Sequence, residues 1–211
     1  MRKPGKKRST TLPQDGVKSK EAILSAALRT FACDGYDGAS MPKIARLAGV
    51  AAPLIHYYFG SKENLWRETV DRSLGELRRE TSAIRDATRA LAPLDQLRAF
   101  LQAISRFAAH WPDHFVMIVA EVRSESKRFD WIHKNYTGPL FEDIVSILRS
   151  ARDKDVIEDV DLEQLALMLM GGVLLYFSMQ PNGFEGRDVD KVSDEFTELM
   201  FHVFLRGVLR S

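Results

Sequence analysis

Apolar residues recur at helical spacing along most of the chain, and this periodicity constrains the fold more than any other feature. Ile23, Ala27 and Phe31 form one stripe, because residues four apart lie on the same face of an α-helix. The same spacing continues through residues 94–104 and 189–208, and the sequence holds no alternating apolar and polar segment of strand length. The pattern predicts an all-α fold of about nine helices.

Glycine and proline mark where these helices end. Asp34-Gly35 ends the first helix, and Gly49 separates two short ones. Pro139, which follows Gly138, strains or breaks a later helix. The last long apolar stretch predicts a helix buried on nearly all sides. The helices are expected over residues 18–34, 40–48, 52–58, 61–90, 94–110, 115–122, 131–152, 162–179 and 189–208.

The formal net charge of +1 conceals an uneven distribution. Residues 1–67 hold 12 Lys and Arg against 5 Asp and Glu, so this part carries +7. The remainder holds 18 against 24 and carries −6. A basic head on an acidic body is typical of a chain whose contact with nucleic acid or a membrane surface is confined to one end.

The composition divides the chain into three parts. Residues 1–17 are rich in Lys, Arg, Pro and Thr and offer little to bury, which predicts a disordered basic arm. Residues 18–64 then form a small helical head, and residues 65–211 form a larger helical body. The sequence lacks a stretch of about 18 uncharged apolar residues and a secretory signal, which favours a cytoplasmic protein without a membrane partner. Cys33 lies in an apolar helix and is expected to be buried and inert.

The block Ser40–Lys62, SMPKIARLAGVAAPLIHYYFGSK, is the most informative segment. A short helix, a glycine turn and a second short helix are typical of a helix-turn-helix, whose second helix lies in the major groove of DNA. Ala45 is small enough for the two helices to cross closely, and Gly49 permits a left-handed turn residue. Val50 and Ile55 can fill the space between the helices. The block therefore predicts a DNA-binding head.

Residues 20–67 closely resemble the N-terminal domain of TetR/AcrR-type transcriptional repressors. Three separate pieces carry the resemblance, namely ILSAALRTFACDGYDGAS, IARLAGV and YYFGSKENLW. The resemblance implies a homodimeric repressor that binds a roughly palindromic operator on double-stranded DNA. It also implies that the last two helices form the dimer and that the body binds a small-molecule effector, whose identity stays open.

The resemblance also implies roles for single residues. Ser40 and Lys43 would contact phosphate at the start of the second helix, and Tyr58 and Lys62 would do so beside the third. The outward positions of the recognition helix are Ala52, Pro53, Leu54, His56 and Tyr57.

The recognition helix departs from the family pattern. Ala51, Ala52 and Leu54 stand where polar residues are frequent, and His56 stands where Tyr is frequent. Apolar groups cannot make bidentate hydrogen bonds to base edges, although they can contact a thymine methyl. Direct readout would rest on His56 and van der Waals contact, and the arm Arg2–Arg8 could compensate in the minor groove.

Aromatic and histidine residues are frequent in the body, where most are expected in the core. A minority could line a ligand cavity. The candidates are Phe107, His110, Trp111, Trp131, His133, Tyr176 and Phe177. Glu121, among apolar neighbours, is either a pocket carboxylate or an outward-facing residue. Gly171-Gly172 favours the close approach of a second helix, or else a local kink.

The sequence shows no signature of an enzyme. It has no glycine-rich phosphate loop and no nucleophile elbow. Pro112 lies between His110 and His114 and disturbs the helix that an i,i+4 metal site requires. We therefore expect a DNA-binding regulator without a cofactor or metal. The alternative is an architectural DNA-binding protein without an inducer, which the apolar recognition helix and the basic arm would also suit.

Overall fold

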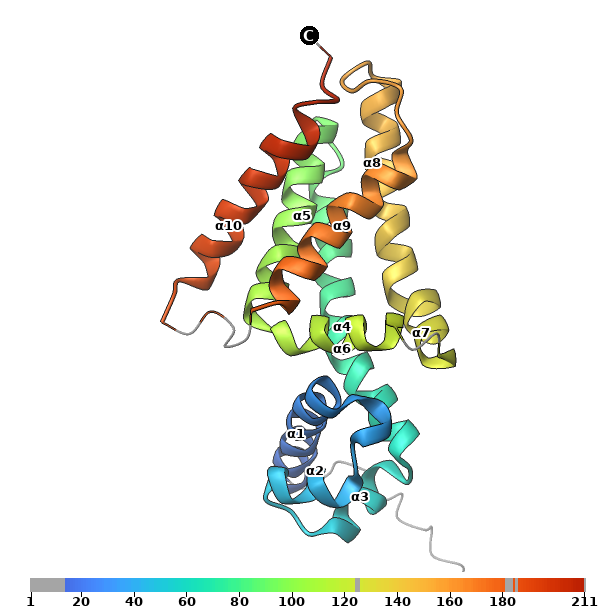
Figure 1. Ribbon diagram of the computed structural model, residues 1–211, viewed down its shortest axis with the longest axis vertical. Coiled ribbons are helices and arrows are strands. Elements are labelled where there is room, and N and C mark those ends of the chain that lie inside the picture. The colour runs from blue at the N-terminus through green and yellow to red at the C-terminus, as the bar shows by residue number, and fades with distance from the viewer. Residues whose placement is uncertain (1–13, 124–125, 181–183, 185, 211) are drawn as a thin grey trace, which may run out of the picture.

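A small helical head and a larger helical body make up the molecule (Figure 1). The computed structural model describes residues 14–123, 126–180, 184 and 186–210. Helices α1 to α3 form the head at one end, and α4 runs from the head into the centre of the body. The fold is all-α, as the periodicity predicts.

The helices are, in chain order, α1 (Gln14–Gly38), α2 (Met41–Ala48), α3 (Ala52–Phe59), α4 (Lys62–Thr88), α5 (Pro93–His110), α6 (Pro112–Arg123), α7 (Lys127–Ile132), a π-helical turn (His133–Thr137), α8 (Gly138–Asp153), α9 (Leu162–Ser178), α10 (Val189–Met200) and a second π-helical turn (Phe201–Leu205). If α7, the first π-turn and α8 count as one continuous helix, and the second π-turn counts as the end of α10, the described residues form nine helical units. The expected number of helices is confirmed in that sense.

The first helix begins earlier than expected and breaks where expected. It starts at Gln14, so residues 14–17, which the composition assigns to the arm, are helical. Gly35 interrupts it with φ 69° and ψ 175°, a left-handed conformation that favours glycine. Cys33 is exposed rather than buried, because it lies on the face opposite the buried Ile23 stripe. Residues 1–13, which include most of the predicted arm, lie outside the described residues.

The π-turn before α8 follows from Gly138-Pro139. Pro139 has no N–H to donate to the preceding helical turn, and the N–H of Gly138 donates to the carbonyl of His133 five residues back. A Cβ on Gly138 would lie 2.7 Å from that carbonyl oxygen, so only glycine fits there without a shift of backbone. The strain predicted at this dipeptide is therefore absorbed as one wide turn.

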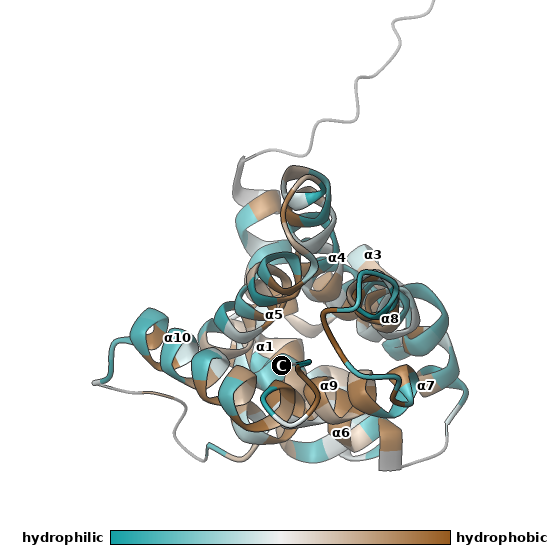
Figure 2. Cartoon of the chain, turned by 90° about the horizontal axis from the view of Figure 1, so that it is seen from above, coloured by the Kyte–Doolittle hydropathy of each residue, from teal (hydrophilic) through white to brown (hydrophobic). Residues whose placement is uncertain are grey.

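Helix α9 is buried on one side only, which corrects the prediction of burial on nearly all sides. Leu165, Leu169 and Val173 face the core, whereas the opposite side is exposed. Seen from above, α9 is hydrophobic along its length (Figure 2). Helix α10 approaches it closely, because a Cβ on Gly172 would lie 3.1 Å from the sulfur of Met200. Gly172 thus permits a close helix contact, one of the two roles considered for the pair, whereas Gly171 lines the cavity described below.

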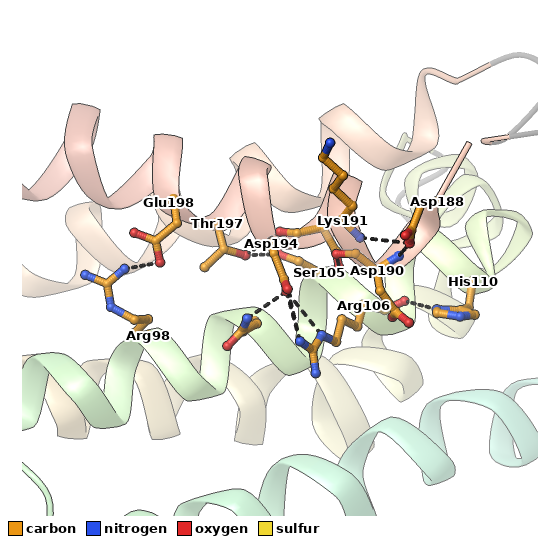
Figure 3. A network of polar contacts seen from close by, with 12 residues as sticks. Arg98, Ser105, Arg106, His110, Asp188, Asp190, Lys191, Asp194, Thr197 and Glu198 are labelled. Carbon is orange, nitrogen blue, oxygen red and sulfur yellow. Dashed lines mark hydrogen bonds and ion pairs between the residues drawn. The ribbon is translucent and has the colours of Figure 1, made fainter. Parts of the chain in front are cut away.

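Polar contacts hold α10 against α5 (Figure 3). Asp194 accepts hydrogen bonds from Gln102 (2.6 Å) and Arg106 (3.0 Å), and Arg98 pairs with Glu198. The buried hydroxyl of Thr197 donates to Ser105 at 3.1 Å. Because these polar residues face α5, the apolar outer residues of α10 remain uncovered in the single chain.

Within the described residues, no helix is long and apolar enough to cross a membrane. Nor do three or more His, Cys, Asp or Glu side chains of this part of the chain gather in a way that could hold a metal ion.

We predict that Gly138→Ala destabilises the protein by about 2 kcal/mol, because its Cβ overlaps a backbone oxygen that cannot move freely. Urea unfolding would measure the change. The control is Gly75→Ala in α4, whose Cβ would only meet the end of the Arg79 side chain at 3.8 Å. The control should gain up to about 1 kcal/mol of helix propensity. Equal stability of the two variants would contradict the packing argument.

Candidate functional site

The segment α2–turn–α3 has the geometry of a helix-turn-helix. Gly49 ends α2 in the left-handed conformation, with φ 68° and ψ 28°. The N–H of Val50 donates to the carbonyl of Ala45 at 3.0 Å, which closes the turn. Ile55 is fully buried and Ala45 almost so, as predicted, and Val50 is half-buried. Close packing of small and apolar residues therefore sets the angle between the two helices.

Helix α3 exposes a mixed apolar and aromatic surface. Pro53, His56 and Tyr57 are exposed, and the side chain of Tyr57 is 75% exposed. The half-buried predicted residues are Ala52, Leu54 and Tyr58. Nδ1 of His56 lies 3.3 Å from the carbonyl oxygen of Gly60, so the ring is positioned by the end of its own helix. All six predicted residues of α3 thus reach the surface at least in part.

The predicted phosphate contacts of α2 are already partly occupied within the protein. The hydroxyl of Ser40 accepts the backbone N–H of Lys43 at 3.3 Å and caps the helix. The ammonium group of Lys43 forms an ion pair with Asp34 of α1. A phosphate would have to share this ammonium group with Asp34.

Lys62 turns back toward the end of α1. Its ammonium lies 4.5 Å from the ring centroid of Tyr36 and donates to the carbonyl of Asp37 at 3.3 Å. The residue is the first of α4, directly after the Ser61 cap, so its charge adds to the positive end of that helix. Lys62 therefore sits beside α3 on a rigid support.

Arg46 is a basic residue that the sequence analysis did not single out. It lies exposed in the last turn of α2 and makes no ion pair within the described part of the chain. The sequence places Arg46 three residues before Gly49 and therefore close to the turn. That position does not indicate which way the Arg46 side chain points.

A cavity of about 380 Å³ lies inside the body. Helices α4, α5, α6, α7, α8 and α9 and the first π-turn all contribute to its wall. Leu74 and Leu77 supply the contribution of α4, the helix that comes from the head. A volume of this size is within the range of small-molecule sites.

The structure does not gather the seven predicted pocket residues in one place. His133 lines the cavity. His110 and Trp111 instead line a second hollow, of about 330 Å³, between the head and the body. Phe107, Trp131, Tyr176 and Phe177 line neither space and pack in aromatic clusters.

Glu121 is neither a wall residue of the cavity nor an outward-facing one. It is 4% exposed and accepts from Ser126 (2.7 Å) and Arg128 (3.1 Å). Arg128 also lies 3.8 Å from the ring centroid of Tyr36, on the head. The carboxylate therefore orients an arginine that bridges the body and the head.

His114 is a buried histidine at the second hollow. It is 6% exposed, stacks on Phe107 with ring centroids 5.4 Å apart, and its Nδ1 has no hydrogen-bond partner within the described residues. Burial lowers the pKa of His114 to about 4. The ring is therefore neutral at pH 7.

Comparisons with known proteins agree with this geometry. Residues 23–69 match the family of bacterial regulatory proteins, tetR family. The HTH-type transcriptional regulator BetI of Agrobacterium fabrum is 40% identical over 92 residues, which are 43% of this chain and 44% of that protein. The match covers less than half the length of that relative.

Two solved structures share the overall fold. The ketosteroid transcriptional regulator KstR2 of Mycobacterium tuberculosis has a TM-score of 0.77 at 19% identity, over 91% of this chain and 95% of that one. The TetR family transcriptional regulator PfmR of Thermus thermophilus has a TM-score of 0.70 at 22% identity, over 89% and 99%.

The head has the geometry of a helix-turn-helix, and the body holds a cavity. The family match is confined to residues 23–69, which are 47 of the 211 residues, and the two solved structures share the fold of nearly the whole chain.

We predict that His114 makes stability fall on acidification. Its pKa in the folded protein, about 4, is below the ordinary value of 6.5, so between these pH values the unfolded chain binds more protons. The contribution of His114 to the free energy of unfolding is fully present above pH 6.5. It is lost as the pH falls to 4, and the loss is about 3 kcal/mol. Urea unfolding of wild type and His114→Phe at pH 7 and pH 4.5 would measure it. The variant keeps the ring stack and should lose less stability, and an equal loss would refute the assignment.

Proposed function

We propose that this chain is a transcriptional regulator that binds double-stranded DNA through α3 and is released by a small molecule bound in the body. One observation carries the proposal. Helix α4 begins beside the recognition helix and continues into the wall of the cavity. A molecule that fits only one position of α4 therefore changes the position of the head, and by linkage changes the affinity for DNA.

Contacts between α4 and the segment formed by α7 and the π-turn give this coupling a physical route. Trp66 of α4 packs on Trp131 of α7, with ring centroids 5.7 Å apart. Tyr136 of the π-turn donates to Asp71 of α4, and Arg78 of α4 donates to the carbonyl of Asn135 at 2.6 Å. The π-turn therefore contacts both the cavity and the helix that carries the head.

Dimer formation would use the outer side of α9 and α10. Six apolar side chains of α9, α10 and the residues directly after them are 54–73% exposed, namely Leu167, Met168, Leu175, Met179, Leu199 and Val203. A patch of this kind is typical of an interface. A two-fold dimer would present two recognition helices to two half-sites, which matches a palindromic operator. We retain the division into a head of residues 18–64 and a body of residues 65–211 as part of this proposal.

The alternative of an architectural protein without an inducer is favoured by the apolar surface of α3, which supports little direct base readout. It leaves the cavity without a role. Low sequence preference in a selection from random DNA would support the alternative, and a defined palindrome would support the regulator.

Lys62→Ala is expected to weaken binding to selected and unrelated duplexes alike, and to reduce the slope of log K against log salt by about 1 per protomer. Fluorescence anisotropy across a salt series would measure both. Lys154→Ala, an exposed lysine after α8, is the control. An unchanged slope for Lys62→Ala would remove this lysine from the phosphate contacts. His56→Ala, in contrast, should change the DNA sequence that the protein selects from random duplexes.

The double variant Leu175→Glu with Leu199→Glu is expected to be monomeric, because dimer formation would bury two unpaired carboxylates in each protomer. Analytical ultracentrifugation would show the mass. Leu91→Glu, at an exposed apolar position between α4 and α5, should leave the dimer intact. A dimeric double variant would place the interface elsewhere.

A further inference from the structure

Among the residues that the structure describes, the wall of the body cavity contains no charged side chain. Its lining residues include no Asp, Glu, Lys or Arg, and three of them have polar side chains: His133, Tyr136 and Thr137. An ionised group placed among the remaining residues would lose its hydration without gaining a partner, which costs a large free energy. The cavity therefore disfavours a ligand whose charge is buried.

All three polar side chains lie on the π-turn, so the polar part of the wall is confined to one place. The hydroxyl of Tyr136 is already engaged with Asp71. Burial and this contact raise the pKa of Tyr136, which stays protonated. Thr137 and His133 remain, with the Thr137 Oγ1 and His133 Nδ1 atoms 3.3 Å apart. Within the described part of the wall, this pair makes no hydrogen bond to a side chain of another helix.

The rest of the wall suits a hydrocarbon. The lining side chains of α5, α6 and α9 are all apolar and include Leu101, Ile104, Ile118 and Leu174. A sugar or nucleotide would bring many hydrogen-bonding groups to this surface, and each one left unpaired costs about 1–3 kcal/mol. The cavity volume of about 380 Å³ still admits a small molecule of moderate length.

We infer that the ligand is an uncharged, mainly hydrocarbon molecule with a hydrogen-bonding oxygen at one end, which His133 and Thr137 bind at the π-turn. The chemical class of the ligand is inferred from the cavity alone. Its effect on DNA binding rests on the proposed function. The binding end lies on the same turn that contacts Asp71 and Arg78 of α4. A ligand oxygen at Thr137 therefore binds directly to the element that joins the cavity to the head.

The test uses three probes with the same ten-carbon chain: decan-1-ol, decanoate and decylammonium. Isothermal titration of the full chain at pH 7.4 should give the tightest binding for decan-1-ol, by tenfold or more over either ion. Thr137→Val should weaken decan-1-ol binding about tenfold. Thr88→Val, which removes a hydroxyl that bonds to the carbonyl of Ile84 outside the cavity, should leave it unchanged. Leu174→Trp, which fills the cavity, should abolish it.

Three results would overturn the inference: equal or tighter binding of an ionic probe, no binding of decan-1-ol, or its undiminished binding to a folded Leu174→Trp variant. Thermal unfolding of each variant shows whether it is folded. The proposed function fails separately, if the chain binds decan-1-ol but selects no DNA duplex, or if decan-1-ol leaves the affinity for a selected duplex unchanged. The ligand assignment survives both of those results.

Discussion

The buried face of α4 is the feature on which the rest of the structure depends. Leu65 and Trp66 at its start are fully buried in the head, and Leu74 and Leu77 line the cavity in the body. Leu77 lies twelve residues after Leu65, which corresponds to about 18 Å along the helix. Because one helix belongs to both cores, the head cannot change its position without a change at the cavity wall.

The polar residues on this face of α4 are satisfied by the helix itself. The hydroxyls of Thr69, Ser73 and Thr81 donate to α4 carbonyls four residues earlier, at 2.7, 2.9 and 2.9 Å. A small displacement of α4 against its neighbours therefore breaks none of these bonds. Specific contacts of α4 with the body lie at the π-turn and at the ion pair of Arg85 with Asp143 of α8. Of these, only the π-turn also lines the cavity within the described residues.

The sequence predicted the fold and the head well because their signals are local. Gly35, Gly49 and the dipeptide Gly138-Pro139 act through the conformation of their own backbone, and the structure has a break, a left-handed turn and a π-turn at these three places. The pocket could not be predicted in this way. Tyr176 and Trp131 have the composition of a ligand site, but each packs against other aromatic rings instead.

The sequence by itself determined the helical fold class, the helix-turn-helix and the segment that matches the TetR family, because periodicity, caps and turns are encoded by residues close together in the chain. Only the tertiary structure decided which side chains enclose the cavity, that Lys43 is paired with Asp34, and which face of α9 stays exposed. These depend on how helices distant in sequence pack against one another. The cavity wall combines side chains from seven segments of the chain, so it exists only when these segments are packed together.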